Sequence, residues 1–108
     1  LIENKKIIFY GAGNWCRQLL AYFKRIECQM PILIWDKAAK EGDLIEGIKV
    51  LPPSFEDYSG KDDVLCIVTL RNPIISKQMC DLLREKDINL INNWTFMDVL
   101  SRKLWSEV

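Results

Sequence analysis

The stretch that decides the fold is IIFYGAGNWCR, residues 7–17. It starts with an apolar run, passes through two glycines and continues into a segment whose apolar residues recur at helical spacing. This order predicts a buried strand, a tight turn and the start of a helix. A helix start carries unpaired backbone N–H groups and the positive end of the helix dipole, so such a turn is suited to hold an anion.

The two glycines of this turn match part of a known fingerprint. Gly11 and Gly13 supply two of the three glycines of the G-x-G-x-x-G pattern, which brings a pyrophosphate close to a helix N-terminus. The third position is Cys16. Cysteine is small, so we expect the turn to survive with a slightly displaced helix. A tight strand-to-helix turn that binds no ligand is the alternative.

Apolar runs and helical segments alternate along the rest of the chain. We expect strands at residues 5–10, 32–35, 64–69 and 88–91, with a short edge strand at 47–51. We expect helices at residues 14–27, 73–86 and 94–105, and one helical turn at 54–58. Asn72 is the expected N-cap of the second helix, followed by Pro73 at its first position.

This alternation predicts an α/β fold. We expect a Rossmann-like three-layer arrangement, with a mostly parallel sheet of four to five strands and helices on both faces. Strand 32–35 is expected beside strand 5–10, strand 64–69 on the other side of strand 5–10, and strand 88–91 beyond it. With 108 residues, the chain is expected to be one domain over residues 1–108. Because it begins with Leu1, we expect it to be a fragment of a longer protein.

The composition limits the classes of partner. Lys and Arg balance Asp and Glu at 15 each, so no net field favours nucleic acid. No apolar run approaches the roughly 20 residues that a membrane span needs, so none is expected. Hydrophobic residues make up 49% of the chain, as in a soluble globular protein. Its four cysteines are widely spaced, so we expect reduced thiols and a cytoplasmic location.

Polar residues at the predicted strand ends complete the candidate site, because ligands of open α/β sheets lie outside the carboxyl ends of the strands. Asp36 ends the second strand, where a carboxylate accepts from ribose hydroxyls and repels a 2′-phosphate, which favours NAD or a UDP-type ribose over NADP. Thr69 and Arg71 follow the third long strand, and Arg71 is a candidate for contact with a phosphate or a sugar carboxylate. A solvated Asp36 and a surface Arg71 are the alternatives.

The chain lacks the residues of several catalytic sites. It contains no histidine, which excludes Cys–His and Ser–His–Asp mechanisms within it. The cysteines form no cluster with zinc-ligand spacing. We therefore predict no catalytic residue and no metal ligand in this chain. The predicted cofactor contacts are Gly11, Gly13, Asn14, Trp15, Asp36, Thr69 and Arg71.

Three segments together resemble a family. IIFYGAGNWCRQLL, ILIWDKAAKEGDLIEGIKVLPPS and DDVLCIVTLRN are similar to the successive strand regions of small Rossmann-like domains in bacterial surface-polysaccharide enzymes. Such domains form the N-terminal part of sugar acetyltransferases of the pilin-glycosylation type and accompany related nucleotide-sugar enzymes. The resemblance implies a nucleotide-sugar or dinucleotide ligand on the glycine turn, with Gly11, Gly13, Asn14 and Asp36 in contact. It also implies that catalysis belongs to a further domain of the same protein.

The sequence thus predicts a nucleotide-binding module of a sugar-modifying enzyme in surface-polysaccharide biosynthesis, with NAD or a UDP-sugar as ligand. One alternative is the cofactor half of an NAD-dependent oxidoreductase. Another is an interaction domain whose nucleotide site has decayed, which Cys16 favours and Asp36 opposes. Whether the chain belongs to an enzyme, such as a sugar transferase, stays open. The tryptophan-rich segment 94–105 is a candidate surface for a homodimer or for the missing domain.

Overall fold

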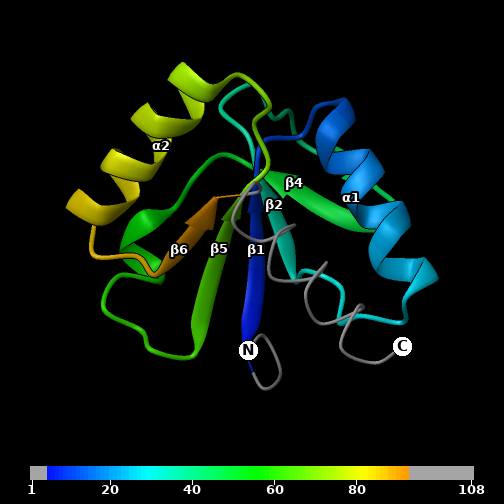
Figure 1. Cartoon of the computed structure of the whole chain (residues 1–108), viewed down its shortest axis with the longest axis horizontal. Helices are drawn as coiled ribbons and strands as arrows, with labels where there is room; N and C mark the ends of the chain where they lie inside the picture. The colour runs from blue at the N-terminus through cyan, green and yellow to red at the C-terminus, as the bar shows by residue number, and fades with distance from the viewer. Residues whose placement is uncertain (1–4, 93–108) are drawn as a thin grey trace.

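A computed structural model describes residues 5–92 of the chain. The elements follow one another as β1 (Lys6–Tyr10), α1 (Asn14–Arg25), β2 (Leu33–Trp35), β3 (Leu44–Ile45), β4 (Ile48–Leu51), the 3₁₀ helix η1 (Phe55–Asp57), β5 (Val64–Val68), α2 (Pro73–Glu85) and β6 (Leu90–Asn92) (Figure 1). The helix and dimer surface expected at residues 94–105 lie outside the described residues.

The strands form one six-stranded sheet in the order β3-β4-β2-β1-β5-β6. β1 pairs in parallel with β2 and β5, β4 pairs in parallel with β2, and β6 with β5. Among the strands of residues 5–92, only β3 runs antiparallel to its neighbour, β4. The α/β class and the predicted order of neighbours around β1 are therefore confirmed.

The sheet has one strand more than the four to five expected, because residues 44–51 fold back on themselves. Ile45 pairs with Ile48 across a two-residue turn. Both turn residues have positive φ, 53° at Glu46 and 79° at Gly47. This is the conformation of a type I′ hairpin turn, and a strand of two residues is too short to show a periodicity of its own.

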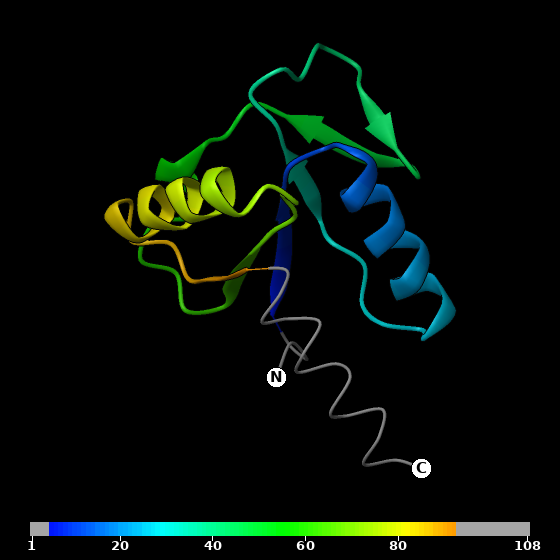
Figure 2. The ribbon, with the colours of Figure 1, turned by 45° about the horizontal axis from the view of Figure 1, so that its top comes forward.

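The helices α1 and α2 cover opposite faces of the sheet (Figure 2). Successive side chains of β1 point to opposite sides. Ile7 and Phe9 pack in one core cluster with α1, where the Phe9 and Phe23 rings meet edge to face at 5.4 Å. Ile8 and Tyr10 lie in a second cluster with Cys80 and Leu83 of α2. The central strand is thus buried on both sides, as its continuous apolar run predicts.

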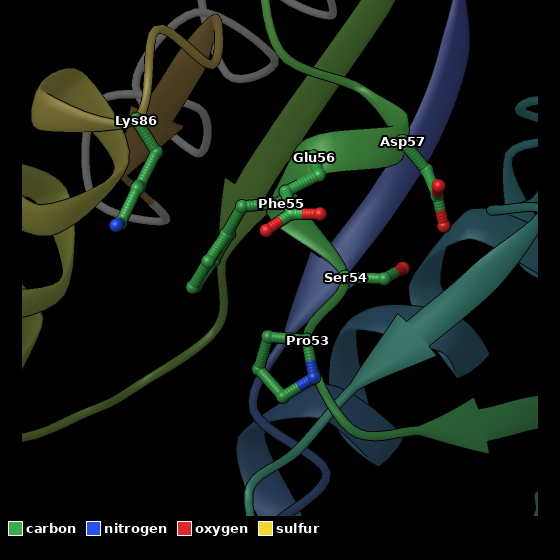
Figure 3. A pocket seen from close by; sticks show the side chains of 6 residues that line it. All are labelled: Pro53, Ser54, Phe55, Glu56, Asp57 and Lys86. Atoms are coloured by element: carbon green, nitrogen blue, oxygen red, sulfur yellow. The ribbon is translucent and has the colours of Figure 1, made fainter.

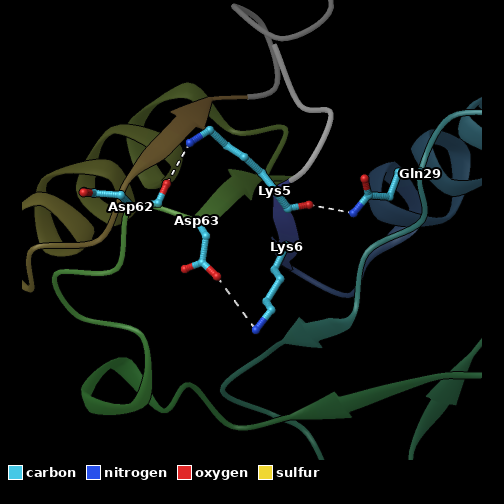
Figure 4. A network of polar contacts seen from close by, with 5 residues as sticks. All are labelled: Lys5, Lys6, Gln29, Asp62 and Asp63. Carbon is cyan, nitrogen blue, oxygen red and sulfur yellow. Dashed lines mark hydrogen bonds and ion pairs between the residues drawn. The ribbon is translucent and has the colours of Figure 1, made fainter.

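The amino-terminal edge of the sheet is held by polar contacts (Figure 4). Lys5 Nζ donates to the Asp62 carbonyl at 2.7 Å, and Gln29 Nε2 donates to the Lys5 carbonyl at 2.6 Å. Lys6 Nζ lies 3.8 Å from the Asp63 carboxylate. These contacts join the starts of β1 and β5 to the chain that follows α1. The opposite, carboxyl-terminal edge carries the glycine turn.

Candidate functional site

Gly11 is the glycine that the fold itself requires. Its φ is +116°, a conformation that other residues rarely adopt. A Cβ at this position would stand 2.8 Å from Cδ2 of Leu70, in the loop that follows β5. The Gly11 N–H donates to the Trp35 carbonyl at 2.8 Å. Gly11 therefore lets the chain leave β1 in close contact with the ends of β2 and β5.

Gly13 is different, because nothing in the described chain demands a glycine there. Its φ of −84° is accessible to any residue. The other four of the five glycines all have positive φ. Apart from Gly13 itself and its two chain neighbours, no heavy atom of the described residues lies within 4 Å of the place where a Cβ would stand. The surface around Gly13, directly before α1, is therefore free of side chains that would contact a Cβ.

The two α-helices begin in different ways. The Asn72 Oδ1 atom accepts from the N–H groups of Ile74 and Ile75, at 2.9 and 3.2 Å, which confirms Asn72 as the N-cap of α2. At the start of α1 the N-cap is Gly13, which forms no side-chain cap hydrogen bond, and the first turn contains no acidic residue. The positive end of the α1 dipole therefore has neither a side-chain cap nor a carboxylate in its own first turn.

Asp36 lies beside the glycine turn and holds it. Its Oδ2 atom accepts from the Ala12 N–H at 2.9 Å, and its Oδ1 atom accepts from the Ala38 N–H at 2.8 Å. The predicted ribose acceptor is thus at the turn, but each oxygen already accepts one hydrogen bond. A carboxylate has about four lone-pair sites, so the Asp36 group retains capacity for further donors.

Thr69 is hydrogen-bonded to the backbone of the glycine turn. Its side chain is buried, and its Oγ1 atom lies 2.9 Å from the Tyr10 carbonyl and 2.7 Å from the Gly11 carbonyl, between which its single proton is shared. The Thr69 N–H also donates to the Tyr10 carbonyl at 2.9 Å. These contacts fasten the end of β5 to the backbone of the turn.

Arg71 and Trp15 come together from distant parts of the chain. The guanidinium carbon of the exposed Arg71 lies 5.7 Å from the ring centroid of Trp15, within cation–π distance. Trp15 belongs to the first turn of α1, and Arg71 to the loop between β5 and α2. All seven residues predicted as cofactor contacts therefore lie around the carboxyl-terminal edge of the sheet. Contact with a ligand stays a prediction for each of them.

Cys16 lies inside the core, not on the open surface of the turn. Its side chain is fully buried among residues of β1 and α1, which include Phe9 and Leu20. Burial raises the pKa of the Cys16 thiol to about 12, and the opposing effects of nearby Arg17 and of a hydrogen bond with Thr69 are smaller. The thiol stays protonated at neutral pH, which makes it a poor nucleophile.

One pocket was not predicted from the sequence. It has a volume of about 330 Å³ and lies between η1 and the end of α2, where Phe55 and Lys86 line it (Figure 3). None of the seven predicted residues borders it. In the sequence, this region is marked only by two aromatic residues, Phe55 and Tyr58, in the predicted helical turn.

Among residues 5–92, no group of three or more His, Cys, Asp or Glu residues is arranged to hold a metal ion. Neither α1 nor α2 is long enough, or apolar enough, to cross a membrane.

Comparison with protein-family models, curated proteins and solved structures finds no significant match to the chain.

Proposed function

We propose that this chain is a Rossmann-like, three-layer nucleotide-binding module whose glycine turn holds the diphosphate of a nucleotide sugar or of a dinucleotide. The central position of β1, with crossovers to both sides and one helix on each face, supports this assignment. In such sheets the ligand lies outside the carboxyl ends of the strands, at the point where the strand order reverses. Gly11 and Gly13 are at that place.

The observation that carries the proposal is the glycine at position 13. Backbone strain explains a glycine where φ is positive, and close neighbours explain one where a Cβ would clash. Neither reason applies to Gly13, which has an ordinary φ and open space around it. Glycine is also a common N-cap residue, and a diphosphate resting against the start of α1 supplies a functional reason for it, because a side chain there would keep the anion away from the backbone N–H groups.

The surrounding residues have distinct roles in this proposal. The N–H groups of Gly13 and Asn14 donate to the diphosphate, and the Arg71 guanidinium, held near Trp15, adds a positive charge on the α2 side. Asp36 accepts from the ribose with its remaining lone pairs and repels a 2′-phosphate. Thr69 positions the turn through its bonds to the backbone. Catalysis belongs to another domain of a sugar-modifying enzyme of surface-polysaccharide biosynthesis.

One observation favours a second function, an interaction domain without a working nucleotide site. Both Asp36 oxygens already accept backbone hydrogen bonds, so the carboxylate has a structural role that needs no ligand. In that case the strand-end aspartate and the tight turn are retained because they hold β1, β2 and α1 together.

A thermal-shift panel tests the proposal. The ligands are UDP-sugars, NAD, NADP, acetyl-CoA and S-adenosylmethionine. A ligand at 100 times its dissociation constant adds about 2.7 kcal/mol to the free energy of unfolding, which in a domain of this size raises Tm by on the order of 10 °C. We expect this shift with UDP-sugars. A shift with NAD alone supports the oxidoreductase alternative, and no shift with any ligand supports the interaction domain.

A further inference from the structure

Two buried polar groups lie unpaired next to the proposed site. The Tyr10 hydroxyl and the Trp35 indole N–H are both inaccessible to solvent, and neither has a hydrogen-bond partner among residues 5–92. The two residues are paired neighbours on β1 and β2, so their side chains are on the same face of the sheet. Buried polar groups are nearly always hydrogen-bonded, and an unpaired one in a native structure calls for a specific explanation.

Aromatic rings from η1 and the residue after it cover this pair. The Phe55 ring stacks on Tyr10 with centroids 6.4 Å apart and an interplanar angle of 5°. The Trp35 ring meets Phe55 edge to face at 5.3 Å and Tyr58 at 5.7 Å. Phe55 and Tyr58 are only half-buried. Phe55 and Tyr58 are thus half-buried aromatic residues packed against the buried Tyr10–Trp35 pair.

The 3₁₀ helix η1, which carries Phe55, makes few contacts with the rest of the domain. None of the three residues of η1 is buried. Two of its backbone hydrogen bonds, from the Asp57 N–H to the Ser54 carbonyl and from the Tyr58 N–H to the Phe55 carbonyl, are within the segment itself. Its anchors come at the following turn, where Ser59 Oγ donates to the Lys86 carbonyl and the Gly60 N–H donates to the Asp87 carbonyl, both at 2.8 Å.

Phe55 also lines the 330 Å³ pocket, where its side chain points into the space between η1 and Lys86 (Figure 3). Phe55 therefore borders both the pocket and the Tyr10–Trp35 pair. The pair offers aromatic surface and two hydrogen-bond donors, which suit a flat ring that carries hydrogen-bond acceptors.

We infer that Phe55 is a movable cover and that the site beneath it receives the nucleobase of the bound nucleotide, with Tyr10 and Trp35 donating to its carbonyl or ring-nitrogen acceptors. This inference rests on the proposed function and names the part of the ligand that lies beyond the diphosphate. Tyr10 pairs with Trp35 at the ends of β1 and β2 and directly precedes Gly11, so both residues are at the same edge of the sheet as the turn. Burial and, to a smaller extent, the Asp36 charge raise the pKa of Tyr10, which keeps its hydroxyl able to donate.

Isothermal titration with UDP and with inorganic pyrophosphate tests the inference. The variants are Tyr10→Phe and Trp35→Phe, each of which removes one donor and keeps an aromatic ring. Tyr22→Phe is the matched control, because it also removes a tyrosine hydroxyl, but Tyr22 belongs to α1 and packs against the other core cluster. We expect Tyr10→Phe and Trp35→Phe each to weaken UDP binding about 3- to 10-fold and to leave pyrophosphate binding unchanged. Tyr22→Phe should change neither.

These measurements distinguish failure of the nucleobase site from failure of the diphosphate site. If the wild-type protein binds pyrophosphate and UDP equally well, or if both variants bind UDP as the wild type does, the nucleobase inference is wrong while the diphosphate site stands. A loss of thermal stability in Tyr10→Phe with unchanged UDP affinity also overturns it, and indicates an internal water. If the wild type binds neither compound, both the inference and the proposed function fail.

Discussion

The carboxylate of Asp36 accepts a hydrogen bond from the Ala12 N–H, with 2.9 Å between the Asp36 Oδ2 and Ala12 N atoms. This contact joins the end of β2 to the turn after β1, 24 residues earlier in the chain. A second one, from the Ala38 N–H to Oδ1, fixes the same carboxylate in the loop after β2. Asp36 is therefore a structural part of the glycine turn, whatever it also does for a ligand.

Replacing Asp36 with Asn should lower stability. The amide has one oxygen and an NH₂ group, so it can accept from only one of the two N–H groups and leaves the other unpaired. Hydrogen bonds to charged groups contribute about 1.5–3 kcal/mol, so we expect a loss of about this size in urea denaturation. Asp81→Asn is the control, because Asp81 pairs with Arg84 on the exposed face of α2 and should cost under about 0.5 kcal/mol. Equal losses in both variants would contradict the role given to Asp36.

The two glycines of the turn should respond differently to alanine. Gly11→Ala places a Cβ against Leu70 at a φ of +116°, so we expect a loss of stability of about 1–3 kcal/mol. Gly13→Ala meets no neighbour at an ordinary φ, so stability should change by less than about 1 kcal/mol. In the proposed function Gly13→Ala nevertheless weakens UDP binding, at least 10-fold by titration. A Gly13→Ala variant with wild-type affinity would remove the main support for the diphosphate site.

Arg71→Ala should reduce ligand affinity with little effect on folding. Loss of a charge-assisted contact with phosphate predicts about a 10-fold weaker UDP affinity and a shallower dependence on salt. The contact with Trp15 is at an exposed site, so its loss should cost under about 1 kcal/mol of stability. Arg84→Ala, at the other end of α2, removes the same charge and should leave UDP binding unchanged. Equal effects of the two variants would indicate only a general charge effect.

Stability should fall at alkaline pH in a way that depends on Cys16. Burial raises the pKa of this thiol from about 9 in the unfolded chain to about 12 in the folded protein. The unfolded chain therefore loses a proton first, so the contribution of Cys16 is constant below pH 9 and is lost as pH rises from 9 to 12. One such thiol adds at most about 1.4 kcal/mol per pH unit to the slope.

Urea denaturation of the wild type and of Cys16→Ala at pH 8 to 10.5 measures this slope. The variant should start from a lower stability because of the cavity that it creates, and should then decline less steeply. Lysines and the other buried thiols titrate in both proteins, so their effects cancel in the comparison. Parallel slopes would show that the Cys16 thiol is not held neutral by the core.

Strong local patterns allowed most of the fold to be predicted. The continuous apolar runs of β1 and β5 predict strands buried on both faces, and Asn72 followed by Pro73 predicts the start of α2. The β3 strand was missed because its turn depends on positive φ at Glu46, a residue that rarely adopts it. The α1 helix was expected to reach Glu27, but it ends at Arg25, and Glu27 has a φ of 55°.

The candidate site was predictable in its location and less so in its contacts. Parallel strands necessarily bring the ends of β1, β2 and β5 to one edge, so Gly11, Asp36 and Arg71 had to lie near one another. The direction of each side chain is set by tertiary packing. Thr69 is therefore buried against the turn, although its position after β5 is equally compatible with an exposed hydroxyl. The partners of Asp36 likewise depend on how the loops meet.

The most direct test of the central claim is an NMR titration of the ¹⁵N-labelled protein with UDP. We predict that the amide signals of Gly13 and Asn14, at the open start of α1, shift in a saturable manner. Those of Ile74 and Ile75, whose N–H groups are bonded to Asn72 at the start of α2, should stay in place. If the Gly13 and Asn14 signals do not move at millimolar UDP, or if both helix starts respond alike, the glycine turn is not a diphosphate site.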